Sequence, residues 1–580
     1  MPDSYVIPRG SRPSHFFLQS IVLLVTSLVI LSCTPEKHPI TGFRNDGRPS
    51  QAALTEWQQG RFSMFIHFGL YSLAGGVWNN QPVTIGYSEQ IRSHGKISKE
   101  EYRKLAGKFN PAKWNPDSVV LLAKAAGMKS VIITAKHHDG FALFKTRFSK
   151  FNIADGTPYK ADLLLGLADA CQRHGLKFGV YFSLIDWDYE GAAPPSNHNS
   201  DSISASHHFL NMGQIEELLT GYGKISELWF DMGKPTVEQS RELAALVRKL
   251  QPQCMISGRI WNDMGDFAVM NDNASPNFRM GQPWQTPASM FDETWGYRSW
   301  QVRNDPQEKA TEKLRSLIRS VANGGNYLLN IGPMGDGSVV PFEKAVLLKM
   351  GEWINSNYDA VMNAKATDAP EQYWGVLTEA NNKIFLFLLN PPADNRITIK
   401  GLRSGISRVY IPSFKEAHFR IVGKNPEPVI EFNRTELQNI PLPVLTVELK
   451  NKAVFEPAEI IEEPSSGALQ LNVNNAVLYH SYSGKDYYST VPSVIKMEWN
   501  IRLKDDRSSA FNFIIPENRE VSKFFISVNE NEWMVDPGLK NITLPEIRMN
   551  KGVNKIIVRP EDQSNPHHDQ GLVFLNITIR

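Results

Sequence analysis

The chain has 580 residues, which is enough for several domains. Its 62 Lys and Arg residues nearly balance 60 Asp and Glu residues, so the charge of +2 gives no reason to expect a nucleic acid or another polyanion as partner. Only three cysteines are present, which excludes a disulfide framework.

Residues 1–33 have the pattern of a targeting segment, in which two arginines precede an almost unbroken apolar run that ends at Cys33. The small residue directly before Cys33 is typical of a bacterial lipoprotein signal, which predicts a lipid on the Cys33 thiol. The alternatives are an uncleaved anchor and cleavage nearby without a lipid. Residues 34–50 are polar and rich in Pro and Gly, as a tether is. We therefore expect the protein in the bacterial cell envelope, held to the membrane by its lipid anchor only.

Strand and helix patterns alternate over residues 51–355, and each helix has recognisable start and stop residues. Repeated units of this size predict a parallel sheet closed into a (β/α)8-type barrel. The expected strands are 61–69, 129–135, 176–183, 226–231, 254–257 and 326–332, and the expected helices are 115–127, 161–175, 209–223, 240–250 and 311–325.

The sequence pattern changes after the barrel, from alternating strands and helices to short strand-like runs. Short strand-like runs with turn signals over residues 356–457 predict a small antiparallel β domain. An acidic linker rich in Pro and Ser follows, and residues 468–580 are again strand-like throughout, which predicts a C-terminal β-sandwich. The fold class is therefore α/β, with two β domains after the barrel.

The segment 226–233, SELWFDMG, is an apolar strand that ends on one carboxylate, Asp231. Such a carboxylate is costly to bury unless neighbouring groups hold it. It is either a cap of the following segment or a nucleophile beside aromatic residues. Polar groups also follow the other expected strands, and catalytic groups of a barrel gather at that rim. These groups are His67, Lys136, His137, His138, Asp139 and Asp186.

Imidazole, indole and carboxylate groups gathered at one rim describe a sugar-binding pocket. A metal site would be the alternative for His137 and His138, but adjacent residues of an extended chain point in opposite directions. No third ligand has a recognisable spacing, so we expect neither a metal nor a cofactor.

Residues 57–335 resemble glycoside hydrolase family 29, the α-L-fucosidases. The stretches that carry the resemblance are WQQGRFSMFIHFGLYS (57–72), AGMKSVIITAKHHDGFALF (126–144), GLKFGVYFSLIDW (175–187), ELWFDMG (227–233) and NGGNYLLNIGPMGDG (323–337). The resemblance implies a retaining hydrolase with a barrel and a small β domain, and the terminal sandwich resembles an added carbohydrate-binding module.

The resemblance also assigns roles. Asp231 is the expected nucleophile, and Glu89 matches an acidic residue that binds sugar hydroxyls. The positions that match substrate contacts are His67, His137, His138, Tyr181, Trp229 and Arg259, and Trp78 and Trp295 are expected to form walls of the pocket.

Three positions depart from the family pattern: Phe68, Gln90 and Gln285. Gln285 stands where the family often has its acid/base glutamate, and an amide does not donate a proton usefully at neutral pH. A nearby loop residue could supply the acid instead. Among Asp272, Asp292 and Glu293 we expect Glu293, for its reach, although Asp292 and Glu293 can equally be solvated loop charges.

The sequence thus predicts an exo-acting hydrolase that removes α-linked L-fucose, or a similar sugar, from a fucosylated oligosaccharide or glycoconjugate. The alternative is a fucosidase-like glycan-binding protein with weak or lost catalysis, as Gln285 would suggest. Linkage preference and oligomeric state are not encoded in any recognisable pattern.

Overall fold

The structure is a computed structural model that describes residues 49–580. Within that range it omits 193, 197–199, 275–278, 413, 415–416, 423–427, 439, 458, 466–467, 482–492, 517–520, 539–540 and 562–571. The expected signal segment, Cys33 and almost all of the tether lie outside the described residues. Within the described part, no helix has both the length and the apolar composition needed to cross a membrane.

Eight parallel strands form the central sheet, and a bridge between Ser257 and Phe267 links its two outermost strands. The sheet therefore closes on itself, and the predicted (β/α)8-type barrel is confirmed. The strands follow one another in the order β7 (Met255–Ile256), β6 (Ile225–Asp231), β5 (Lys177–Ser183), β4 (Ser130–Lys136), β1 (Phe62–Ile66), β11 (Asn326–Ile331), β10 (Trp284–Ala288) and β8 (Ala268–Val269).

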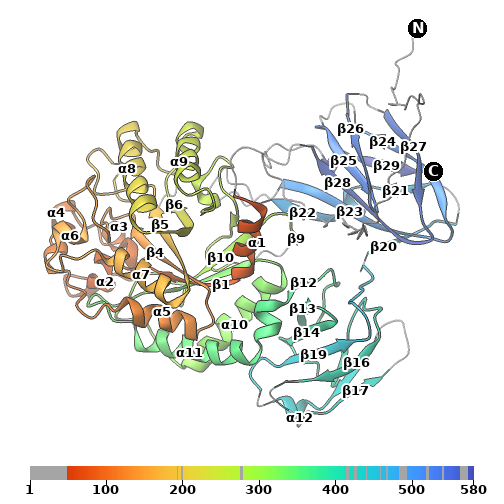
Figure 1. The fold of residues 1–580 in the computed structure, drawn as a ribbon, viewed down its shortest axis with the longest axis horizontal. Coiled ribbons are helices and arrows are strands. Elements are labelled where there is room, and N and C mark those ends of the chain that lie inside the picture. Colours follow the sequence, from red (N-terminus) through yellow and green to blue (C-terminus); the bar gives the residue numbers. More distant parts are fainter. Residues whose placement is uncertain are drawn as a thin grey trace, which may run out of the picture. The chain divides into compact units, whose positions relative to one another are not determined.

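Helices cover the outer surface of this sheet (Figure 1). Their apolar faces form one large buried cluster with the outward-facing side chains of the strands, such as Leu228 and Phe230 of β6. The helices are α5 (Pro116–Ala125), α7 (Leu163–His174), α8 (Ala205–Gly221), α9 (Val237–Leu250), α10 (Pro306–Ala322) and α11 (Pro341–Ser356).

Local sequence signals explain where these helices begin and end. The side chain of Asn115 accepts a hydrogen bond from the Ser118 amide at 2.9 Å, and Pro116 occupies the first turn of α5, where its missing N–H costs nothing. Helix α7 is capped by Asp162 and ends at Gly175, whose φ of 72° is left-handed and therefore suits glycine.

Two β regions follow the barrel. The first contains a five-stranded sheet and a three-stranded sheet around their own apolar cluster. The five strands are β12 (Lys365–Ala366), β13 (Gly375–Ala380), β14 (Lys383–Leu388), β19 (Val444–Leu449) and β16 (Ile406–Tyr410), and the three are β15 (Arg396–Thr398), β18 (Val429–Phe432) and β17 (Phe419–Val422).

The second region has two sheets that share a separate buried cluster, as a β-sandwich does. One sheet contains β26 (Asn531–Val535), β25 (Phe524–Val528), β28 (Gly552–Pro560), β23 (Ser493–Leu503), β22 (Val477–Ser481) and β20 (Ile460–Glu462), together with β9 (Arg279–Met280). The other contains β21 (Leu469–Leu471), β29 (Asn576–Ile579), β24 (Arg507–Ile514) and β27 (Asn541–Met549).

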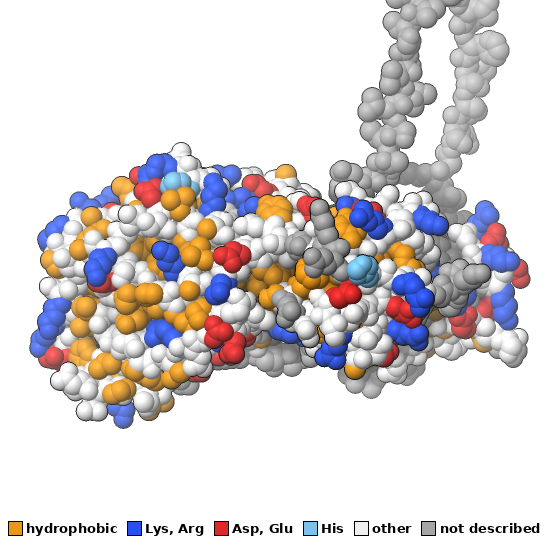
Figure 2. Space-filling view, turned by 90° about the horizontal axis from the view of Figure 1, so that it is seen from below, with side chains coloured by type: hydrophobic (Ala, Val, Ile, Leu, Met, Phe, Trp, Pro, Cys, Tyr) orange, Lys and Arg blue, Asp and Glu red, His pale blue; other side chains and the backbone are white. Residues whose placement is uncertain are grey.

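Charged side chains of both signs are interspersed on the face drawn in Figure 2, with apolar side chains between them. This mixture agrees with the nearly balanced charge of the whole chain.

Candidate active site

A pocket of about 500 Å³ lies at the carboxyl ends of the barrel strands. Nine of the residues expected from the sequence line it together, although they come from segments far apart in the chain. They are His67, Glu89, His137, His138, Tyr181, Trp229, Asp231, Arg259 and Trp295. Their convergence follows from the parallel sheet, in which all carboxyl ends meet at one rim.

The alternation of strand β6 places Asp231 in this pocket. Leu228 and Phe230 pack outward among the helices, whereas Trp229 belongs to the aromatic cluster inside the barrel. Residues two apart on a strand share a face, so Glu227, Trp229 and Asp231 all face the interior. Asp231 is the last residue of the strand, and this position brings its carboxylate to the pocket floor.

Two donors hold the Asp231 carboxylate. The Tyr181 hydroxyl donates to Oδ2 at 2.7 Å, and Nη1 of Arg259 donates to Oδ1 at 3.0 Å. Asp231 is only 7% exposed, so these bonds replace the water that an ionised carboxylate would otherwise require. A carboxylate fixed in this way has the charge and orientation that a nucleophile needs.

Three buried histidines form one side of the pocket. Burial lowers the pKa of His67 to about 3 and that of His138 to about 4, and it lowers the pKa of His137 well below its usual value. All three are therefore neutral at physiological pH. A neutral imidazole both donates and accepts a hydrogen bond, which suits the hydroxyl groups of a sugar.

The histidines are oriented by groups behind them. Nδ1 of His67 lies 2.7 Å from Oδ1 of Asn330, and Nδ1 of His138 lies 2.8 Å from the Ser183 hydroxyl. Nδ1 of His137 has no hydrogen-bond partner among the described residues.

Aromatic rings complete the walls. The ring of Tyr181 stacks on Trp229 with centroids 5.5 Å apart, and Trp295 lies 5.2 Å from the His67 ring. The guanidinium of Arg259 lies over the Trp229 ring at 4.9 Å. These planar faces can pack against the apolar face of a pyranose ring.

Glu89 is a second carboxyl group in the pocket wall, located in a short 3₁₀ helix, Ser88–Gln90. Its Oε2 accepts hydrogen bonds from the amides of Trp295 at 3.2 Å and Gly296 at 2.8 Å. Burial raises its pKa to about 7, and only 2% of the residue is exposed. It is therefore poised to bind a sugar hydroxyl in either protonation state.

Asp272 is the third carboxyl group that lines the pocket. Nη2 of Arg259 donates to its Oδ1 at 2.8 Å, so the guanidinium of Arg259 binds both Asp231 and Asp272. The Asp272 side chain is 29% exposed, against 10% for that of Asp231, which places it nearer the solvent.

Glu293, the expected acid, does not line this pocket. Its side chain is exposed, and its backbone carbonyl accepts a hydrogen bond from Arg298 at 2.7 Å. The neighbouring Asp292 is also exposed and lies 3.6 Å from Lys313. The geometry therefore gives no support to an acid from this pair.

Gln285 also lies outside the pocket, in the interior of the barrel at the start of β10. Its Oε1 accepts from the Trp229 indole at 3.0 Å, and its Nε2 donates to Oε2 of Glu227 at 3.4 Å. The side chain thus supports Trp229 from below and does not line the pocket, contrary to our interpretation of this position as that of an acid/base residue.

Trp78 forms part of a short hairpin strand, β2 (Val77–Trp78), and packs against the buried cluster of the barrel. It does not line the pocket, so the geometry does not support it as a wall. The sequence left out several residues that do line it: Phe65, Tyr87, His94, Met232 and Asn271. Of these, the aromatic residue Tyr87, close to Glu89, was the most visible signal.

Among the described residues, no group of three or more His, Cys, Asp and Glu side chains is arranged to hold a metal ion. The adjacent His137 and His138 have ring centroids 3.8 Å apart, and the rings of Tyr71, Tyr181 and Trp187 lie beside them.

A closed barrel with a held carboxylate, aromatic walls and neutral imidazoles at its carboxyl end defines the class of glycoside hydrolases. The family model for α-L-fucosidase matches residues 42–359, more than half of the chain. The chain therefore belongs to the α-L-fucosidase family.

Comparison with individual relatives agrees with this family assignment. The chain is 27% identical to tissue α-L-fucosidase of Bos taurus over 393 residues, which are 63% of this chain and 80% of that protein. It is similar to a solved α-L-fucosidase of Paenibacillus thiaminolyticus, with a TM-score of 0.60 at 27% identity over 69% of this chain and 99% of the other.

Two further structures are informative. A GH29 α-L-fucosidase of Bacteroides thetaiotaomicron, trapped as a covalent intermediate with 2-fluoro-fucosyl fluoride, has a TM-score of 0.62 at 25% identity and covers 70% of this chain and 98% of its own. The α-L-fucosidase of Vibrio sp. strain EJY3, at 24% identity and a TM-score of 0.65, covers 92% of this chain and 98% of its own and shares the fold.

Proposed function

We propose that this protein is an exo-acting, retaining α-L-fucosidase that removes terminal α-linked L-fucose from glycans. The observation that carries the proposal is the Asp231 carboxylate, which Tyr181 and Arg259 hold on the floor of the pocket. The trapped covalent intermediate of the Bacteroides relative supports the same two-step chemistry here.

In the first step, an Asp231 oxygen attacks the anomeric carbon while a carboxylic acid protonates the leaving oxygen. The glycosidic bond breaks and a fucosyl ester forms on Asp231. In the second step, water attacks the same carbon, the other carboxyl group takes the water proton, and free fucose leaves with its original anomeric configuration.

For the acid/base we propose Asp272 in place of Glu293. An acid must reach the leaving oxygen, which in an exo-acting enzyme lies towards the pocket mouth. Asp272 is the more exposed of the two remaining pocket carboxyl groups, whereas Glu89 is buried and held by two backbone amides. Asp231 and Asp272 share one guanidinium, which is compatible with the roughly 5–5.5 Å separation of retaining enzymes.

Recognition of the sugar then falls to the remaining groups. Glu89, His67, His137 and His138 are placed to bind hydroxyls, and the indole faces of Trp229 and Trp295 are placed to contact the apolar side of the ring. A second candidate function, glycan binding without catalysis, rested on Gln285, and that side chain points away from the pocket towards Glu227.

We further propose that a lipid on Cys33 anchors the protein to the bacterial envelope, on the basis of the apolar run and small residue before it. A Cys33→Ser variant should lose lipid labelling and move to the soluble fraction. Unchanged membrane partitioning would favour an uncleaved anchor.

The experiment that tests the main proposal is hydrolysis of an aryl α-L-fucoside followed by NMR. We expect the α anomer of L-fucose to appear first. Appearance of the β anomer first would exclude a retaining mechanism, and binding of fucose without any hydrolysis would favour the glycan-binding alternative.

A further inference from the structure

A second cavity, of about 470 Å³, lies at the opposite end of the barrel, where the strands begin. Its lining includes residues from the first halves of several strands, such as Ser63, Ser130, Lys177, Glu227 and Asn326. Helix α1 (Gln51–Gly60) contributes further residues to the lining. The amino end of such a barrel ordinarily serves stability, so a cavity of ligand size there needs an explanation.

Glu227 is the most unusual residue of this cavity. It is 2% exposed, and its Oε2 accepts from the Trp57 indole at 2.7 Å and from Gln285. Its Oε1 has no hydrogen-bond partner among the described residues. A buried, unpartnered carboxyl oxygen is costly, and native structures rarely retain one without a bound molecule or water.

Charges around the cavity balance. Three lysines, Lys129, Lys177 and Lys224, stand against three acidic residues, Glu56, Asp169 and Glu227. Lys177 pairs with Glu56 at 2.9 Å, and Lys129 reaches the Tyr358 hydroxyl at 2.8 Å. The lining therefore favours neither a strong anion nor a strong cation as occupant.

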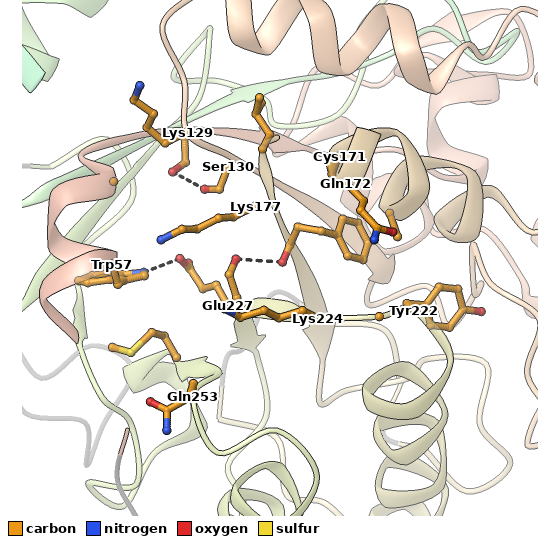
Figure 3. Close-up of a pocket in the computed structure, with 18 of the residues that line it drawn as sticks. Trp57, Lys129, Ser130, Cys171, Gln172, Lys177, Tyr222, Lys224, Glu227 and Gln253 are labelled. Carbon is orange, nitrogen blue, oxygen red and sulfur yellow. Dashed lines mark hydrogen bonds between the residues drawn. The ribbon is translucent and has the colours of Figure 1, made fainter. Parts of the chain in front are cut away.

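Hydrogen-bond donors and acceptors nevertheless both line the cavity. In Figure 3, the side chains of Trp57, Lys177 and Glu227 converge on one side of the cavity, and Ser130 lies above them. The lysine donates, the carboxyl oxygen of Glu227 accepts, and the serine hydroxyls can do either. This set matches a molecule with several neutral hydroxyl groups.

We propose that this cavity is a second binding site for a monosaccharide-sized neutral polyol, held through Oε1 of Glu227 and Nζ of Lys177. The site is separate from the catalytic pocket, because no residue lines both cavities. L-Fucose is the probe of choice, and this choice rests on the proposed function, since L-fucose is the expected product.

The test uses full-length protein whose catalytic pocket is first filled with 2-fluoro-fucosyl fluoride, with the label verified by mass spectrometry. Titration of L-fucose into the labelled protein should show one remaining binding event by calorimetry. A crystal soaked with L-fucose should show the sugar within hydrogen-bond distance of Glu227. Absence of heat, or a sugar bound elsewhere, would overturn the proposal.

Two variants sharpen the result. Lys177→Met should weaken binding at least tenfold while hydrolysis of an aryl fucoside stays unchanged, and Lys344→Met, an exposed lysine of α11, is the matched control. Glu227→Leu should abolish binding, and if it does not fold, Lys177→Met still decides. Unweakened binding by Lys177→Met would contradict the assigned site. If no covalent label forms, the proposed function fails, and the soak of unlabelled crystals still tests the cavity.

Discussion

The two ends of the barrel contain similar chemical groups but use them differently. At the carboxyl end, Asp231 accepts hydrogen bonds from Tyr181 and Arg259, and Arg259 brings a positive charge beside it. At the amino end, Glu227, only four residues earlier on the same strand, accepts hydrogen bonds from an indole and an amide, and burial raises its pKa to about 7. The partners supplied by other strands, and not the strand itself, decide whether a carboxyl group is a nucleophile or a buried acid.

The largest effect is expected from removing the nucleophile. Asp231→Ala should lower kcat for an aryl fucoside by roughly four orders of magnitude or more, because the covalent route is lost. The matched control at the other end, Glu227→Gln, should retain most of its activity. Comparable rates of Asp231→Ala and wild type would show that Asp231 is not the nucleophile.

The acid/base assignment gives the next largest effect. Asp272→Asn should lower kcat/KM for natural fucosylated glycans by about 10²–10⁴-fold and affect activated aryl fucosides much less, since a good leaving group needs little protonation. Glu293→Gln should change neither rate. A large, substrate-selective loss in Glu293→Gln with none in Asp272→Asn would restore the acid expected from the sequence.

The third prediction concerns Gln285, which bonds both Trp229 of the catalytic pocket and Glu227 at the amino end of the barrel. Gln285→Glu should lower kcat/KM by roughly tenfold, because a second carboxyl group beside Glu227 removes a donor and displaces Trp229. The double variant Glu227→Gln with Gln285→Glu exchanges the amide and the carboxyl group and should recover most of the loss. A gain of activity in the single variant would show that Gln285 does face the sugar.

The smallest effect is a pH dependence of stability. Glu227 in the folded chain has a pKa of about 7, above its ordinary value in the unfolded chain. Between these two values the folded state binds more protons, so the contribution to stability is complete at low pH and is lost as pH rises through about 7. Glu227→Gln should remove about 2–3 kcal/mol of this dependence in urea unfolding between pH 5 and 8. Parallel curves for variant and wild type would contradict the raised pKa.

Much of the fold could be predicted from the sequence, because local signals agreed with the tertiary structure. The cap Asn115 and the terminator Gly175 mark helices where the structure has them, and the apolar strand before Asp231 is buried as expected. Parallel strands then bring Asp231, His67 and His138 to one rim without further information.

The acid/base residue could not be predicted from the sequence, and the reason is physical. Asp272 and Glu293 both lie in irregular segments, after β8 and after β10, where no periodicity fixes the direction of a side chain. Only the path of the folded chain brings Asp272 to Arg259 and leaves Glu293 exposed.

The placement of Gln285 and the presence of the amino-end cavity were not predicted, for a related reason. Gln285 is the second residue of β10, and a shift of one residue there decides whether a side chain faces the barrel interior or the outer helices. The bond between Trp57 and Glu227 joins residues 170 positions apart, which no local pattern reports.

The central claim is that Asp231 forms a covalent bond with the sugar. Its most direct test is incubation with 2-fluoro-fucosyl fluoride, followed by proteolysis and mass spectrometry of the peptides. The account predicts one fluorofucosyl adduct, located on the peptide that carries Asp231 and absent from Asp231→Ala. An adduct on Glu89, Asp272 or any other residue, or hydrolysis that proceeds without any adduct, would contradict it.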